Sequence, residues 1–369
     1  MTASTRTEPV TLDLALCARV LGVDLDEHPR LLLRAARAQG WALPVTVLSL
    51  LARDGLALGS GSGDELRRAR TRRATYAGTV EAMVAATGGR VVKGPSLAEF
   101  YPDGVERAVG DIDFIVPDEA TLWRAAAVVL DRHPVETINL SVFGRDERAV
   151  LVVLEWPAGD PVLDNDFKVE ICTTPFAGDG GAVPVRSGLP ADRSVADLLA
   201  LGEERFQRPF SAKDVLDIAV VGGVERFAVD DLVDAARRLL LAPELVELFD
   251  LADEAGVLGA LAPALPGLRD AAEVERARRA AWTPPPPPGD EDRIGDALES
   301  GRFVGGLLLR RTAWRSDLPG IRVHRYAGGA LLITPVGDFM AVDTPLVDED
   351  DYHAALAELD RLDARGARP

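Results

Sequence analysis

One stretch, residues 91–116, most constrains the fold: V-V-K-G-P-S-L-A-E-F-Y-P-D-G-V-E-R-A-V-G-D-I-D-F-I-V. It predicts a strand that ends in a turn of small residues, and a second strand that opens with two aspartates one residue apart. Successive side chains of an extended strand point to opposite faces, so Asp111 and Asp113 share one face while Ile112 and Phe114 share the other. We therefore expect the face with the two aspartates to hold catalytic or binding residues and the face with Ile112 and Phe114 to pack into the hydrophobic core.

Two carboxylates at this spacing suit a hard divalent cation, because Mg²⁺ takes oxygen ligands and is usually held by one or two carboxylates together with substrate phosphates. The turn of Gly94, Pro95 and Ser96 lies upstream. A glycine backbone can approach a phosphate closely, and a serine hydroxyl and the amides of a helix N-terminus can bind it. A phosphate site together with a metal site indicates a nucleotide.

The motifs K-G-x-S (residues 93–96), Tyr101-Pro102, Arg107 and G-D-I-D-F (residues 110–114) resemble the DNA polymerase beta-like nucleotidyltransferase superfamily. Within it, the chain is most similar to the bacterial "uncharacterised nucleotidyltransferase" group, and more distantly to abortive-infection toxin nucleotidyltransferases. The resemblance covers about residues 10–280, with its specific motifs in residues 91–116, 167–172 and 208–218. Pro95 departs from the pattern, which has a small residue there.

The resemblance implies an enzyme that moves a nucleoside monophosphate from a nucleoside triphosphate to an acceptor hydroxyl or phosphate and releases pyrophosphate. Mg²⁺ would be the cofactor, with Mn²⁺ as the alternative ion. Asp111 and Asp113 would bind two metal ions, and Gly94 and Ser96 would hold the β- and γ-phosphates. Such transfers depend mainly on positioning and charge neutralisation.

A two-metal mechanism also needs a third carboxylate, because its two ions lie about 4 Å apart and clamp the attacking and leaving oxygens. In the family this acid sits on a later strand. Residues 167–172, F-K-V-E-I-C, fit with Glu170 as the acid and Cys172 where the family has His. Glu155, at the end of the preceding strand, is the alternative, although it could equally be a rim residue or a salt-bridge partner.

Four further residues are candidates for the nucleotide site. Residues 208–218, R-P-F-S-A-K-D-V-L-D-I, resemble the family's K-D-x-x-D element, in which Lys213 would reach the triphosphate and Asp217 would orient it. These two stand at i and i+4, so an intrahelical salt bridge is the alternative. Lys93 would neutralise phosphate charge or pair with Asp111, and Arg107 would join the site or brace the D-I-D strand.

The expected fold class is α+β, with a polymerase beta palm-like mixed sheet, flanking helical regions and a small C-terminal β-rich domain. Apolar residues recur at helical spacing within residues 12–21, 43–51 and 76–84, and the glycine-rich residues 59–63 predict a flexible loop. Period-two or β-rich runs predict strands at residues 90–93, 112–116, 137–143, 149–156, 167–173, 305–309, 321–326, 330–334 and 339–342.

These patterns divide the chain into five regions. They are an N-terminal helical region (1–88), the nucleotidyltransferase palm (89–185), a helical region that completes the nucleotide site (186–282), a proline-rich linker (283–292) and a C-terminal β-rich accessory domain (293–369). The five consecutive prolines at 284–288 favour an extended polyproline segment.

The net charge of the chain indicates which kinds of partner it can bind. The 41 Lys and Arg residues against 59 Asp and Glu give a net charge of −18, which disfavours loose adhesion to bulk DNA or to an anionic membrane. Five arginines gather within residues 67–73, and they predict either a solvated helix face or a contact to phosphate or RNA. The acceptor could be a tRNA end, a protein side chain, a peptide or a small molecule such as an aminoglycoside.

The remaining sequence features mainly argue against particular kinds of site and location. Cys17 and Cys172 lie far apart with no C-x-x-C motif, and the four histidines have no metal-ligand spacing, so neither zinc nor a disulfide framework is indicated. With no signal peptide and no apolar run of 18 residues, a cytoplasmic protein is expected. Two other interpretations remain: a non-catalytic nucleotide-binding or scaffolding protein on the same fold, and an ordinary α/β domain whose D-x-D is surface decoration.

Overall fold

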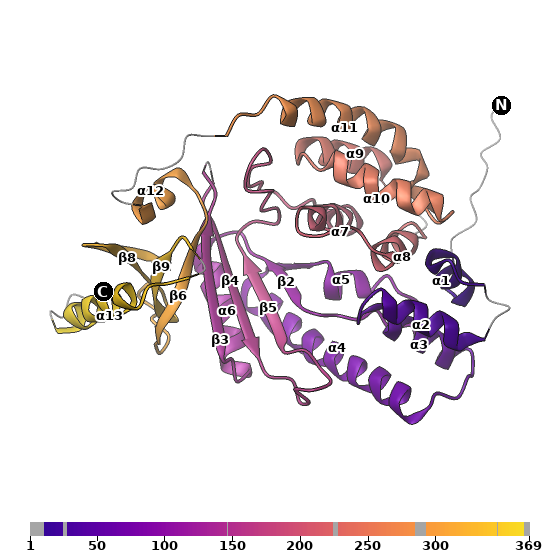
Figure 1. Cartoon of the computed structure of the whole chain (residues 1–369), viewed down its shortest axis with the longest axis horizontal. Helices are drawn as coiled ribbons and strands as arrows, with labels where there is room; N and C mark the ends of the chain where they lie inside the picture. Colours follow the sequence, from indigo (N-terminus) through magenta and orange to yellow (C-terminus); the bar gives the residue numbers. More distant parts are fainter. Residues whose placement is uncertain are drawn as a thin grey trace. The chain divides into compact units, whose positions relative to one another are not determined.

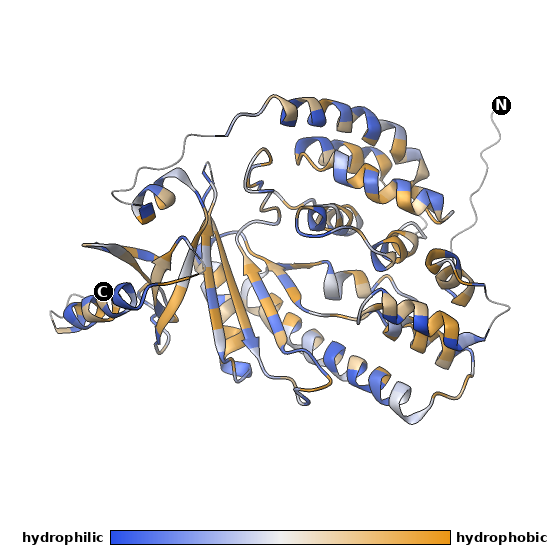
Figure 2. Cartoon of the chain, in the orientation of Figure 1, coloured by the Kyte–Doolittle hydropathy of each residue, from blue (hydrophilic) through white to orange (hydrophobic). Residues whose placement is uncertain are grey.

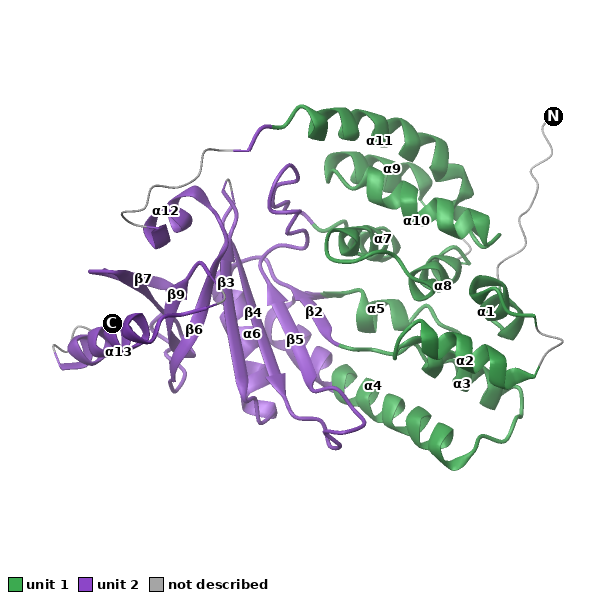
Figure 3. Cartoon of the chain, in the orientation of Figure 1, with its two compact units in different colours: residues 1–77, 91–110, 189–282 green, residues 78–90, 111–188, 283–369 purple. Residues whose placement is uncertain are grey.

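The computed structural model describes residues 11–24, 28–145, 147–223, 228–284, 293–344 and 346–364. The chain forms two compact units, each assembled from three segments (Figure 3). Unit 1 contains residues 1–77, 91–110 and 189–282, and unit 2 contains residues 78–90, 111–188 and 283–369. Most of the predicted proline-rich linker, residues 285–292, lies outside the described residues.

Unit 1 is helical (Figure 1). Its first segment holds α1 (Leu14–Leu21), α2 (Pro29–Ala38), α3 (Leu43–Arg53) and most of α4 (Ser60–Thr87), and its second holds α5 (Gly94–Ala98). Its third segment holds α7 (Arg193–Glu203), η1 (Glu204–Phe206), α8 (Ala212–Val221), α9 (Val229–Arg238), α10 (Ala242–Glu254), η2 (Gly259–Ala264) and α11 (Leu265–Ala280). Polar and apolar bands alternate along these helices, as expected where one side joins a core (Figure 2).

Two helices of unit 1 were predicted only in part from the sequence. Helix α2 lies within the region predicted to be helical, although no separate apolar stripe was assigned to it; it begins with Pro29 in its first turn, where a missing N–H costs nothing, and the His28 ring caps it by accepting from the Arg30 N–H at 3.1 Å. The predicted loop at 59–63 was wrong, because α4 already begins at Ser60. The Gly63 N–H donates to the Gly59 carbonyl at 2.8 Å, so these glycines form the first turn of a helix of 28 residues.

Within the described residues, eight strands of the sheet belong to unit 2, in the order β2-β5-β4-β3-β6-β9-β8-β7, and the short β1 lies where the chain passes from unit 2 to unit 1. The strands are β1 (Arg90–Val92), β2 (Ile112–Ile115), β3 (Thr137–Phe143), β4 (Ala149–Trp156), β5 (Phe167–Cys172), β6 (Val304–Arg311), β7 (Arg322–Tyr326), β8 (Gly329–Ile333) and β9 (Gly337–Val342). β2 and β5 run parallel, while β5-β4-β3-β6-β9-β8-β7 pair antiparallel. The prediction of an α+β fold with a mixed sheet is therefore confirmed.

The two faces of this sheet differ. Along β4, Val152, Leu154 and Trp156 are buried, while Val153 and Glu155, which alternate with them, are only half-buried. Helix α6 (Glu119–Arg132) packs against β4 and β5 and buries the apolar side chains of one face. Because side chains alternate along a strand, the residues between those apolar positions line the opposite, more open face.

The C-terminal strands continue the same sheet, since β6 pairs with β3 through Val142 and Val304. Helix α13 (Glu349–Ala364) covers β8 and β9 with a small core that includes Leu331, Met340 and Leu359, and α12 (Arg293–Ser300) contacts β6 and β8. Within the described parts of the chain, no helix combines the length and the apolar character needed to cross a bilayer.

Candidate functional site

Unit 2 places the three predicted carboxylates at one face of its sheet. Asp113 lies in β2 and Glu170 in β5, and the parallel register sets these two residues opposite each other. Residues opposite each other on paired strands share a face and lie about 5 Å apart. Asp111 stands two residues before Asp113, next to the start of β2, so all three carboxylates lie at the more open face of the sheet.

Lys168 joins two of these acids. It precedes Glu170 by two residues on β5 and therefore shares its face. Its Nζ lies 2.9 Å from Asp111 Oδ2 and 2.7 Å from Glu170 Oε1, and all three side chains are about one third exposed. Burial lowers the pKa of Lys168, but the charge of Asp111 and the hydrogen bond to Glu170 outweigh burial and raise it. No role was predicted for Lys168 from the sequence; its spacing of two residues from Glu170 was the available signal.

Glu155, the alternative third carboxylate, lies on β4 directly opposite Lys168. It shares the open face but is one strand further from β2, because β5 stands between β4 and β2. Glu170 is the acid opposite Asp113. Cys172 follows on the same face of β5, and burial raises the pKa of its thiol to about 12, so it remains protonated at neutral pH.

Carboxylate oxygens are the donors that Mg²⁺ prefers, so the chemistry of this donor set fits that ion. The arrangement, however, holds an ammonium between two of the acids. Among the described residues, no group of three or more His, Cys, Asp or Glu side chains is gathered to hold a metal ion. A metal at Asp111 and Glu170 therefore requires Lys168 to move.

Unit 1 contains the predicted phosphate turn, and Asp197 of α7 fixes it. Asp197 Oδ1 accepts the Lys93 backbone N–H at 2.8 Å, and its Oδ2 accepts the Ser96 hydroxyl at 2.6 Å. Lys93 has a φ of 54°, a strained value for a residue with a side chain, and these bonds help to hold it. Burial raises the pKa of Asp197 to about 6 against the opposing effect of the Ser96 hydrogen bond. No local sequence signal links Asp197 to a turn about 100 residues earlier.

Other polar groups of the turn also have protein partners. Lys93 Nζ lies 2.5 Å from Glu204 Oε1, and the Gly94 carbonyl accepts from Arg107 Nη1 at 3.0 Å. The Ser96 side chain is buried, and its oxygen also accepts from Arg193 Nε at 3.0 Å. The groups expected to bind phosphate thus take part in the internal hydrogen bonding of unit 1.

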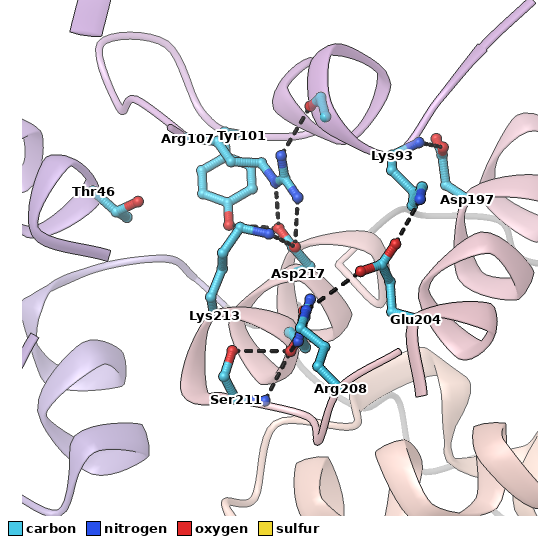
Figure 4. A network of polar contacts seen from close by, with 12 residues as sticks. Thr46, Lys93, Tyr101, Arg107, Asp197, Glu204, Arg208, Ser211, Lys213 and Asp217 are labelled. Carbon is cyan, nitrogen blue, oxygen red and sulfur yellow. Dashed lines mark hydrogen bonds and ion pairs between the residues drawn. The ribbon is translucent and has the colours of Figure 1, made fainter. Parts of the chain in front are cut away.

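Arg107 and Asp217 form a buried ion pair (Figure 4). Arg107 donates from Nε and Nη2 to the two carboxylate oxygens of Asp217, at 2.7 and 2.9 Å, and the Tyr101 hydroxyl donates to Oδ1 at 2.8 Å. Burial alone would raise the pKa of Asp217, but the charges of Arg107 and Lys213 outweigh it and lower the pKa to about 2. Asp217 therefore stays ionised and positions its partners.

Lys213 makes the predicted i, i+4 contact, with Nζ 3.4 Å from Asp217 Oδ2, and a quarter of its side chain is exposed. Burial lowers the pKa of Lys213, and the charge of Asp217 opposes this effect. The salt bridge is thus present, and nucleotide binding by Lys213 stays a prediction. At the start of the same helix, Arg208 pairs with Asp214, which closes a capping box with Ser211.

The five arginines of residues 67–73 bind acceptors of the protein itself. Arg67 and Arg68 pair with Asp64, and Arg70 and Arg73 pair with Glu106. Arg72 donates to the carbonyls of Val109 and Gly110, at 3.2 and 3.1 Å, and its guanidinium stacks over the Tyr76 ring. Arg72 therefore braces the backbone immediately before the D-x-D motif.

No family model, no curated protein and no solved structure matches this chain. The candidate site is therefore interpreted from its own residues. The predicted residues form two groups, each assembled within its own unit: Asp111, Asp113 and Glu170 in unit 2, and Lys93, Gly94, Ser96, Arg107, Lys213 and Asp217 in unit 1.

Proposed function

We propose that the chain is a Mg²⁺-dependent nucleotidyltransferase that transfers a nucleoside monophosphate from a nucleoside triphosphate to an acceptor and releases pyrophosphate. One observation carries the proposal: Asp113 and Glu170 face each other on parallel strands, with Asp111 tied to Glu170 through Lys168. Three carboxylates on one open sheet face suit the binding of divalent cations, which in turn attract a polyphosphate, and the D-x-D motif opens the strand as the resemblance implies.

In this proposal Asp111, Asp113 and Glu170 supply the oxygen ligands. A bound Mg²⁺ would polarise the phosphoryl oxygens and neutralise charge on the leaving pyrophosphate. Within unit 1, Lys213, a quarter of whose side chain is exposed, stays a candidate for binding phosphate, and Asp217 would hold its ammonium in place. Lys93, Gly94 and Ser96, also in unit 1, stay candidates for binding phosphate, in a turn that Asp197 fixes in one conformation.

The test is pyrophosphate release with Mg²⁺ and each of the four nucleoside triphosphates, with a cell extract as the source of acceptor. We expect the wild type to release pyrophosphate with at least one nucleotide. The double variant Asp111→Asn, Asp113→Asn should release none, because it loses two of the three carboxylates. Asp234→Asn, at an exposed ion pair on α9, is the matched control and should keep full activity. Equal release by the wild type and the double variant would contradict the proposal.

A second candidate is a nucleotide-binding or scaffolding protein without catalysis. The contacts that favour it are those of Ser96 with Asp197, of Lys93 with Glu204 and of Asp217 with Arg107, because these groups already satisfy one another. This candidate predicts stabilisation by Mg²⁺ and nucleotide in a thermal-shift assay, with no pyrophosphate release under any acceptor condition.

The acceptor in this proposal is a small molecule, a peptide or a protein side chain more readily than tRNA, in a cytoplasmic enzyme. The net charge of −18 repels polyanions. The arginines of residues 67–73 already pair with Asp64 and Glu106 or hold backbone carbonyls. An acceptor with a positive charge would instead be attracted by the acidic surface.

A further inference from the structure

Lys168 lies among the acidic side chains of the open sheet face, where a metal ion would bind. Its Nζ contacts one oxygen of Asp111 and one oxygen of Glu170, on either side of the β2–β5 pairing. Glu155 stands opposite it on β4, and Asp113 stands opposite Glu170. The ammonium therefore offsets part of the negative charge that four neighbouring acids place on this face.

A divalent cation that ligates Asp111 and Glu170 uses the same carboxylates that the ammonium contacts. Two cations that share these acids repel each other, and the repulsion is stronger at a partly buried site than in bulk water. The two arrangements therefore exclude each other. Lys168 has a flexible four-carbon stem and is about one third exposed, so its ammonium can leave the acids without unfolding the strand.

We propose that Lys168 is a resident counter-ion of the carboxylate site, which competes with the divalent cation and leaves when the cation binds. The inference rests on the proposed function, since it concerns the same three acids. Lys168 is then a positioning residue, because its ammonium holds Asp111 and Glu170 in place before a metal ion binds. The same contact lowers the affinity of the site for the metal ion.

The first experiment measures Mn²⁺ binding to the full chain without nucleotide, by electron paramagnetic resonance of the free ion. Lys168→Met keeps the length of the side chain and removes its charge, and it should bind Mn²⁺ about tenfold more tightly than the wild type, which corresponds to about 1.4 kcal/mol. Lys168→Arg keeps the charge and should remain within about threefold of the wild type. Arg132→Met removes a charge from the exposed end of α6 and should leave the affinity unchanged.

The outcomes separate this inference from the proposed function. If the wild type binds Mn²⁺, the variant Asp111→Asn, Asp113→Asn does not, and Lys168→Met binds no more tightly than the wild type, then the competition is refuted while the metal site stands. If neither the wild type nor Lys168→Met binds Mn²⁺, the metal site of the proposed function is refuted and the competition with it.

A second experiment requires no metal, and it uses urea unfolding in the presence of a chelator. Lys168→Met should lower the unfolding midpoint of the wild type, because Asp111 and Glu170 lose their counter-charge. In the background of Asp111→Asn and Glu170→Gln, the same substitution should have little effect, since the acids it neutralises are gone. Equal shifts in both backgrounds would show that Lys168 stabilises the fold by packing alone and would overturn the counter-ion role.

Discussion

Asp217 shows how much a single buried charge matters in unit 1. Its side chain is fully buried, yet it remains ionised because Arg107, Lys213 and the Tyr101 hydroxyl all contact it. A buried carboxylate without such partners would instead take up a proton. The network joins two segments of the unit, since Tyr101 and Arg107 follow α5 and Asp217 lies in α8. Its removal should therefore affect stability more than any surface ion pair.

We predict that Asp217→Asn lowers the free energy of unfolding by about 3–5 kcal/mol, because it leaves the buried Arg107 guanidinium without a carboxylate. Urea denaturation at pH 7 measures this loss. Asp234→Asn, which removes an exposed pair with Arg237 on α9, should cost less than about 1 kcal/mol. Similar losses in the two variants would contradict the account of this network.

Asp197 should give a pH dependence of the opposite sign to that of a salt-bridged acid. Its pKa of about 6 in the folded chain exceeds the ordinary aspartate value of 3.8. Between pH 4 and pH 6 the folded state therefore binds more protons than the unfolded state, so its contribution to stability falls as the pH rises through this window.

The measurement is the difference in unfolding free energy between the wild type and Asp197→Asn, taken at pH 4, 5, 6 and 7. We expect the wild type to lose about 2 kcal/mol relative to the variant across this range, at about 1.4 kcal/mol per pKa unit. Asp234→Asn should show no comparable trend. Parallel curves for the wild type and Asp197→Asn would mean that Asp197 has an ordinary pKa.

Elements with a strong local pattern were predictable from the sequence. Strands β3 and β4 begin and end where β-rich runs bounded by turn residues predicted them, at residues 137–143 and 149–156. The loop predicted at 59–63 was wrong because glycine signals a turn only when nothing downstream favours a helix. Here Asp64 pairs with Arg67 and Arg68 at helical spacing and stabilises the first turns of α4.

The first turn of α4 gives a direct test of that correction. Gly61 and Gly63 have helical backbone and no neighbouring atom within 4 Å of an added Cβ. Gly61→Ala and Gly63→Ala should each stabilise the protein by about 0.5–1 kcal/mol, because alanine loses less entropy in a helix. Gly22→Ala, at a φ of 65° after α1, should instead destabilise it. Thermal unfolding of the three variants measures these effects.

At the scale of the whole molecule, the chain crosses between its two units several times, near residues 77, 90, 110, 188 and 282. This explains why the site was only partly predictable. Local patterns indicate the three carboxylates, through the D-x-D motif and the acid in residues 167–172, but their placement on one face depends on the register of β2 and β5, which only the tertiary structure gives. The partners of Ser96 and Arg107 are Asp197 and Asp217, about 100 residues away, and no local pattern indicates such pairings.

The net charge gives a prediction at the same scale. We expect tRNA to bind weakly at physiological salt, because the chain carries a charge of −18 and its densest arginine cluster is engaged internally. Arg68→Ala with Arg72→Ala should lower the unfolding midpoint and leave tRNA affinity within about twofold of the wild type. Affinity measured across a salt series tests this. A steep salt dependence that the two substitutions abolish would instead identify a phosphate contact.

The most direct test of the proposed nucleotidyl transfer follows the α-phosphate and the γ-phosphate of the nucleotide separately. Nucleoside triphosphates labelled at the α- or the γ-phosphate would be incubated with Mg²⁺, extract and either wild type, Glu170→Gln or Glu155→Gln. The account predicts that wild type and Glu155→Gln transfer the α-label to an acceptor and release the γ-label as pyrophosphate, and that Glu170→Gln does neither. Transfer of the γ-label to an acceptor, or equal activity of Glu170→Gln and wild type, would contradict it.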